Sequence, residues 1–178
     1  MQTIINVAQA FGLAGEIYDL TPYRVDAYEV ATEVTIGGVA GRSSAGAVGA
    51  MDATTYTAFA GIFVRPHEAV NYGTVSAGSA YPLDPSLAQP AGATVQVLSM
   101  GRVVVNFSLT GSSEATVTAA TLADGTSMYV TSAGVLTTTS TNNTLIGKVV
   151  KGIKANASGV SGSGSNWTKT QPIVIELG

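Results

Sequence analysis

Alternation of apolar and polar residues gives the first clear structural signal in the chain. Residues 28–36 read Tyr-Glu-Val-Ala-Thr-Glu-Val-Thr-Ile, in which apolar side chains recur with a period of two. Because successive side chains of a strand point to opposite faces, this pattern predicts a half-buried β-strand. Residues 57–64 are apolar nearly throughout, as in a strand of the core, and Pro66 ends this segment.

Residues 94–109 hold the strongest strand signal. Two runs rich in β-branched residues, 94–100 and 102–109, flank Gly101. A glycine inside a long strand pattern weakens the strand locally, so we expect a bulge or a sharp bend at Gly101. Further strands are predicted at residues 128–130, 135–137, 144–154 and 172–177.

Two short segments between these strands carry local signals. Residues 115–120 alternate threonine with small apolar residues, and we interpret them as strand. Asp124-Gly125 lies between strand-like segments and predicts a hairpin turn. Evidence for helix is weak, because the composition is rich in threonine and β-branched residues, and one turn at residues 86–89 is the most that we expect.

Short strands at regular spacing, separated by glycine-rich turns, predict an all-β fold. We expect an antiparallel sandwich or barrel, jelly-roll-like or β-tulip-like, with long loops. The longest expected loop covers residues 77–90, which contain one glycine and three prolines. We predict that residues 29–178 form a single β-rich body.

Residues 1–28 have a different pattern and are predicted to form an extended N-terminal arm. They show no sustained period, and glycine, proline and tyrosine interrupt them. Such a segment cannot easily build its own core, so its apolar side chains are expected to fill pockets elsewhere. An edge strand and loop packed on the same domain is the alternative. The arm residues expected to contact a partner are Phe11, Leu13, Ile17, Tyr18, Leu20, Pro22 and Tyr23.

Composition favours a protein whose surface is covered by a partner. Charged residues make up 11% of the chain, against about 25% in an ordinary domain. The net charge is −3 and no cluster of lysine and arginine occurs, which argues against nucleic-acid binding. No run of about 18 apolar residues exists, so we expect no membrane-spanning helix. Low charge with a mean hydropathy of +0.32 indicates protein contacts.

Candidate chemistry is sparse, and we expect a protein that is not an enzyme and holds no metal or cofactor. The chain has no cysteine and one histidine, His67, and its carboxylates are scattered. A β-sandwich hydrolase or ligand-binding module, with Trp167, Tyr72 and Tyr81 stacking on sugars, is a further alternative. Residues of the body expected at an interface are Arg65, His67, Tyr72 and Tyr81.

Several segments, in this order, resemble the structural cement (capsid decoration) proteins of tailed bacteriophages. They read GEIYDLTP at residues 15–22, FAGIFVRPHEA at 59–69, VLSMGRVVV at 97–105, DGTSMYVTSAGVL at 124–136 and IGKV at 146–149. The fourth segment departs from the family pattern, because the order of Asp124 and Gly125 is reversed.

The resemblance implies a structural protein that binds the outside of an assembled capsid and bridges neighbouring major capsid subunits. It further implies a place on the virion exterior after synthesis in the bacterial cytoplasm, and self-association, with a trimer favoured over a dimer. A tail-tube, tail-tip or fibre-base subunit is the alternative, because small-residue β patterns recur in many phage proteins.

Overall fold

The computed structural model describes residues 13–19, 22–65, 88–155 and 159–178. These residues form mostly antiparallel β-sheet, which confirms the all-β prediction. The elements are β1 (Arg24–Glu29), β2 (Val34–Thr35), β3 (Val39–Arg42), β4 (Val48–Ala50), β5 (Ala58–Val64), β6 (Ala88–Gln89), β7 (Thr94–Gly111), α1 (Glu114–Ala119), β8 (Ser127–Val130), β9 (Leu136–Thr137), β10 (Thr144–Lys151), β11 (Val160–Ser163) and β12 (Asn166–Leu177).

The 18-residue strand β7 joins the two halves of the main sheet. The strand order is β4-β3-β5-β7-β12-β10-β8-β9, with β1 added on β7 and β11 on β12. The first part of β7 pairs with β1 and β5, and residues from Gly101 to Gly111 pair with β12. One continuous strand therefore belongs to both groups of neighbours.

The predicted irregularity at Gly101 is confirmed. The pairing of β1 with β7 shifts between Arg24 and Val25, which face Met100 and Leu98, so that Ser99 is an extra residue on β7. Gly101 follows with a φ of +120°, and a Cβ atom there would lie 2.7 Å from Cβ of Tyr23. Glycine allows both the bend and the close approach of the segment that contains Tyr23.

The hydrophobic core lies where the two groups of strands face each other. Its larger cluster combines Ile62 of β5, Val103 of β7, Met128 of β8 and Ile175 of β12, all without exposed surface. A second cluster packs Phe63 of β5 against buried side chains of β3, β4 and β7. Burying one such side chain contributes about 1.5–3 kcal/mol, so the two clusters account for most of the stability of the body.

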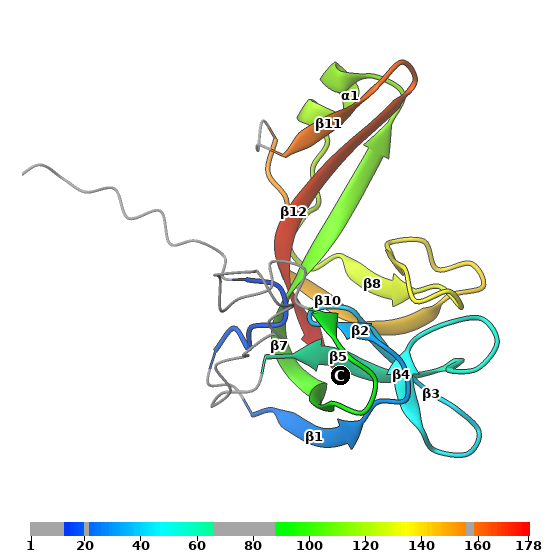
Figure 1. Cartoon of the computed structure of the whole chain (residues 1–178). Coiled ribbons are helices and arrows are strands. Elements are labelled where there is room, and N and C mark those ends of the chain that lie inside the picture. The colour runs from blue at the N-terminus through cyan, green and yellow to red at the C-terminus, as the bar shows by residue number, and fades with distance from the viewer. Residues whose placement is uncertain (1–12, 20–21, 66–87, 156–158) are drawn as a thin grey trace, which may run out of the picture.

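Beyond this core, β7 and β12 continue together away from the body and carry β11 and α1 at their far end (Figure 1). We call this part the projecting ribbon. It comprises residues 106–111 of β7, α1, β11 and residues 166–172 of β12. The remaining described residues form the body.

Two predicted strands differ in the structure. Residues 28–36 do not form one strand, because β1 ends at Glu29 and β2 holds only Val34 and Thr35. The chain bends after Val30, which is fully buried and forms a parallel bridge with Val48 of β4. The strand predicted at residues 115–120 is wrong, because Glu114–Ala119 form the helix α1, in which Ser113 caps the first turn and Val117 packs over Gly111.

The predicted hairpin at Asp124-Gly125 is also absent from the structure. The segments before and after this turn do not pair with each other. The Asp124 carboxylate accepts a hydrogen bond from the Gly152 N–H, and the Gly125 N–H donates to the Val149 carbonyl. The turn is therefore held by β10 and the residues that follow it. At residues 86–89, the described part is the strand β6, which pairs with β2, and not a helical turn.

Candidate functional site: the strap and the projecting ribbon

Residues 13–19, which we call the strap, lie along the edge of β7 that β12 leaves open. The N–H groups of Gly15 and Tyr18 donate to the carbonyls of Val104 and Arg102, each at 2.8 Å. The N–H of Val104 donates to the Glu16 carbonyl at 2.9 Å. The strap thus pairs with β7 through an isolated antiparallel bridge between Ile17 and Val103, and it covers part of an edge that would otherwise expose backbone groups.

The strap also joins β7 to the end of β5. The Arg65 N–H donates to the Gly15 carbonyl at 2.8 Å, and the Arg65 side chain reaches the Ala14 carbonyl at 3.5 Å. Gly15 has a φ of +82°, and a Cβ atom there would lie 2.3 Å from the Ile36 side chain. Only glycine fits at position 15 without displacing the adjacent segment at Ile36.

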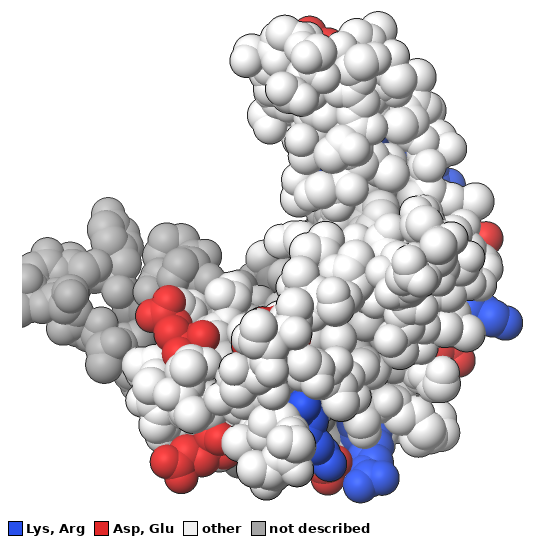
Figure 2. All heavy atoms as spheres, turned by 90° about the vertical axis from the view of Figure 1, so that its right-hand side faces the viewer, with Lys and Arg blue, Asp and Glu red and all other residues white. Residues whose placement is uncertain are grey.

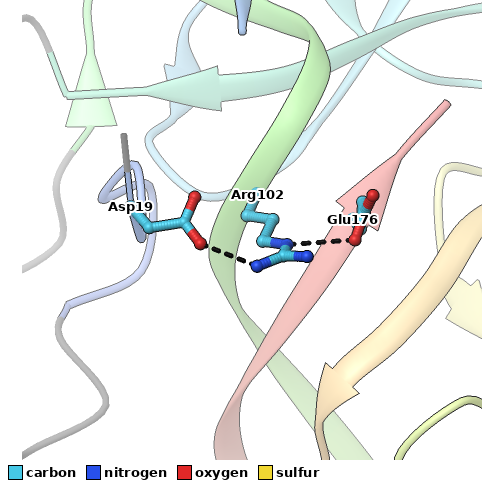
Figure 3. A network of polar contacts seen from close by, with 3 residues as sticks. All are labelled: Asp19, Arg102 and Glu176. Atoms are coloured by element: carbon cyan, nitrogen blue, oxygen red, sulfur yellow. Dashed lines mark hydrogen bonds and ion pairs between the residues drawn. The ribbon is translucent and has the colours of Figure 1, made fainter. Parts of the chain in front are cut away.

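Arg102 connects the strap to β12 through two ion pairs (Figure 3). Its Nη1 atom lies 2.8 Å from Oδ2 of Asp19, and its Nε atom lies 3.0 Å from Oε2 of Glu176. The hydrogen bonds to Asp19 and then to Glu176 raise the pKa of Arg102 above its ordinary value. The guanidinium therefore ties three segments of the chain together at a solvent-accessible position.

Aromatic and apolar contacts complete the attachment of the strap. Nζ of Lys151 lies 4.7 Å from the centre of the Tyr18 ring, a cation–π geometry. Ile17 is half-buried, bridges to Val103 of β7 and packs against the larger core cluster. Two of the predicted arm residues thus contact the body of their own chain.

Other predicted interface residues leave their side chains exposed. Leu13 exposes 60% and Tyr23 exposes 49% of its surface, and Pro22 is exposed next to Tyr23. Arg65 is half-buried against the strap, as described above. Phe11, Leu20, His67, Tyr72 and Tyr81 lie outside the described residues. A role in partner binding stays a prediction for all of these residues.

Sequence reasoning missed three exposed apolar side chains. Met100 is 44% exposed in β7, next to Gly101, against which Tyr23 packs. Val135 and Leu145 are 59% and 58% exposed on the turn before β9 and on β10. Apolar residues in strand patterns are normally assigned to a core face, so the sequence carries no signal that would separate these from buried ones.

The projecting ribbon is almost free of exposed charge. Within its residues the charged side chains are Glu114, which is exposed, and Lys169, which is fully buried. Figure 2 shows the ribbon rising from the body as an almost entirely uncharged surface, with the charges gathered around the body. Its exposed face in β7 consists of Asn106, Ser108 and Thr110.

Lys169 holds α1 against β12 within the ribbon. Its ammonium group donates to the carbonyls of Thr118, Ala120 and Lys154 at 3.0, 2.6 and 3.4 Å. These carbonyls come from the last turn of α1 and from the segment after β10, which the lysine therefore holds against β12. A lysine in an alternating strand pattern is normally predicted to be exposed, and no local signal indicated that Lys169 is buried.

One cavity of about 250 Å³ opens at the end of the ribbon. It is lined by Trp167 and by the backbone and small polar side chains of Thr110, Gly111, Ser165, Asn166 and Thr168. None of these residues titrates near neutral pH, and the part of the chain that the structure describes contains no cluster of metal-ligating side chains. Nor does it contain a helix that could cross a membrane.

Comparisons with known proteins place this fold. The sequence model of the family described as structural cement protein (E217 gp24/Pam3 gp6) matches residues 1–166. A chain from the solved structure titled "The capsid of Myoviridae Phage XM1" superposes with a TM-score of 0.53 at 17% sequence identity, over 92% of this chain and 88% of that chain. At this identity the superposition shows the shared fold alone. No curated protein matches the chain.

Proposed function

The chain belongs to the phage structural cement protein family, and from this premise we propose that it binds the outer surface of an assembled capsid and bridges neighbouring major capsid subunits. The observation that carries the proposal is the family match over residues 1–166, which include the strap and most of the body. The family indicates a structural protein of the phage capsid, as the resemblance in the sequence predicted, and not an enzyme. The proposed location is the virion exterior, reached after synthesis in the bacterial cytoplasm.

The distribution of charge supports a contact role. Burying a charged side chain at an interface without an oppositely charged partner costs free energy and weakens binding. The projecting ribbon exposes a single charged side chain, and apolar side chains remain exposed on the body. Such surfaces can be covered by another protein at little desolvation cost.

We propose the Tyr23 patch, made of Pro22, Tyr23 and Met100, as one of the capsid contacts. Cβ of Tyr23 lies against Gly101, while the residues Tyr23 and Met100 remain 49% and 44% exposed. Aromatic residues and methionine are enriched at protein interfaces relative to the rest of the surface. The patch adjoins the strap, which is attached to β7 and to the end of β5.

Cosedimentation with assembled shells of the same phage's major capsid protein tests the proposal. The wild-type chain is expected to pellet with the shells at a saturating ratio and to raise the temperature at which the shells fall apart. The Tyr23→Ala variant is expected to bind about tenfold more weakly, the loss typical of an anchoring aromatic residue. Val135→Ala, at an equally exposed apolar site of the body, serves as the matched control and should bind like the wild type.

Failure of the wild-type chain to bind shells would contradict the proposal. Formation of rings or tubes by the purified protein in the absence of shells, seen by negative-stain microscopy, would instead support the tail-subunit alternative. Equal binding by the wild type and Tyr23→Ala would remove the Tyr23 patch from the contact and leave capsid binding to other surfaces.

A further inference from the structure

The second half of β7 has an open edge. The even-numbered residues Arg102 and Val104 direct their backbone groups toward the strap. Because backbone groups alternate in direction along a strand, those of Asn106, Ser108 and Thr110 point to the same side, while the register with β12 runs without a shift from Gly101 to Gly111. Among the described residues, the strap ends at Val104 and no strand pairs with this edge beyond it.

This edge lacks the features by which proteins normally protect open strands. Charged side chains, prolines, bulges and short strands are the usual protection. β1 carries Arg24, Asp26 and Glu29, β4 and β9 have three and two residues, and β11 is a four-residue strand with Gly162 at a φ of +146°. The edge from residue 106 to residue 110 has none of these features. An unprotected edge of this kind is typical of a strand that pairs with another chain.

We propose that this edge pairs, antiparallel, with the same edge of a second copy of this chain. The three residues are their own complement about Ser108, because Ser108 would face Ser108 of the copy and Asn106 would face Thr110 of the copy. Each pair would exchange two backbone hydrogen bonds, and no like charges would meet. The result is a continuous sheet with the central order β12-β7-β7-β12, formed by two ribbons across a twofold axis.

Side chains on both faces agree with this pairing. On one face, Asn106, Ser108 and Thr110 are exposed, small and uncharged, and Ser108 already shares a 2.8 Å hydrogen bond with Thr170 of β12. On the other face, half-buried Leu109 would lie beside Phe107 of the copy and lose its remaining exposed surface. In Figure 1, β7 forms the outer border of the ribbon, and Figure 2 views the molecule from that side, where the ribbon shows almost no charge.

The pairing differs from the trimer that the resemblance favours, and it does not depend on capsid binding. A twofold pair holds two copies whose bodies lie at opposite ends of the shared sheet. Two copies joined in this way would present two sets of shell contacts and gain avidity from their effective concentration. A pair in solution without shell binding would overturn the proposed function alone.

Single cysteines test the register, because the natural chain has none. In the proposed pair, the two Cα atoms of residue 108 lie about 5.5 Å apart, within the range that a disulfide spans. Ser108→Cys is therefore expected to form a disulfide-linked dimer under mild oxidation. Thr170→Cys is the matched control, since it faces Ser108 on the same side of the ribbon but would lie about 14 Å from its counterpart, three strand spacings away.

Both variants should be oxidised free in solution and bound to shells, and the wild type should be weighed by light scattering. We expect about 36 kDa for the wild type, twice the 17.9 kDa of one chain. Absence of the Ser108→Cys disulfide in both states overturns the proposal, as does equal crosslinking of Thr170→Cys. The proposal is also overturned if the wild type is a monomer in solution and the Ser108→Lys variant loses shell binding. In that case the edge would pair with a strand of the capsid protein and not with a second copy.

A charge pair gives an independent test that does not need oxidation. Ser108→Lys or Ser108→Asp alone would place like charges opposite each other and weaken the dimer by about fivefold. Mixing the two variants is expected to restore dimers that contain one copy of each. Failure of the mixture to pair better than either variant alone overturns the register about Ser108.

Discussion

Strands β7 and β12 run through both the body and the projecting ribbon, and their surroundings differ between these two parts. In the body, three consecutive residues of each strand, 103–105 of β7 and 173–175 of β12, are buried on both faces. In the ribbon, β7 alternates exposed Asn106, buried Phe107 and exposed Ser108. One ladder of hydrogen bonds thus runs from an apolar core into a part with little core. The body supplies stability, and the ribbon supplies accessible surface.

The ribbon depends on polar contacts where the body depends on burial. Its helix α1 has six residues and buries one side chain, Val117. An isolated helix of this length is unstable in water, so contacts made by other parts of the chain must hold it. The three carbonyl contacts of Lys169 are the strongest candidates. The comparison predicts that the ribbon is sensitive to loss of a buried polar group and the body to loss of buried volume.

The largest effect is expected from Lys169→Ala, at about 3 kcal/mol of unfolding free energy. The change leaves three carbonyls without their donor and opens a cavity. Lys169→Met keeps most of the volume and should lose about 1–2 kcal/mol, because the carbonyls still lose their donor. Denaturant unfolding gives the size of each loss, and hydrogen exchange shows whether it is concentrated in α1 and β11. Wild-type protection of α1 in Lys169→Met would show that the lysine does not hold the helix.

The strap gives a second comparison within the body. Ile17 packs on the core, whereas Leu13, four residues earlier, exposes 60% of its surface. Ile17→Ala should therefore lower the unfolding free energy by about 1–2 kcal/mol, less than a fully buried isoleucine would. Leu13→Ala is the control and should change it by less than about 0.5 kcal/mol. Equal stability of the two variants would mean that the strap does not contribute to folding.

The sequence revealed those parts of the fold that local pattern determines. The alternation and the glycine predicted β-structure and the irregularity next to Gly101, because both depend on residues close in sequence. The strap was left open between an arm and an edge strand, since its partner Val104 lies nearly ninety positions away. The helix α1 was missed because its alternating threonines resemble a strand, while its cap at Ser113 and the packing of Val117 over Gly111 depend on the folded ribbon.

The smallest expected effect is a loss of local stability at low pH, and we expect it in the body and not in the ribbon. In the loop between β4 and β5, the Asp52 carboxylate accepts backbone hydrogen bonds from Thr55, Thr54 and Tyr56. These bonds favour the ionised form and lower the pKa of Asp52 below its ordinary value, the Thr55 N–H contributing most. Because the pKa is lower in the folded chain than in the unfolded one, the stabilisation is present at neutral pH and is lost as pH falls through the folded-state pKa.

Acidification below about pH 4 should therefore loosen this loop before the ribbon, in which Glu114 is the one carboxylate among the described residues. Hydrogen exchange of residues 52–56 and of α1, followed from pH 6 to pH 2.5, measures the difference. Asp52→Asn should remove the pH dependence of the protection factors in the loop, which are the ratios of intrinsic to observed exchange rate, and leave those of α1 unchanged. Simultaneous loss of protection in both regions would mean that body and ribbon unfold as one unit in acid, and that the difference in their packing does not divide the molecule into separately stable parts.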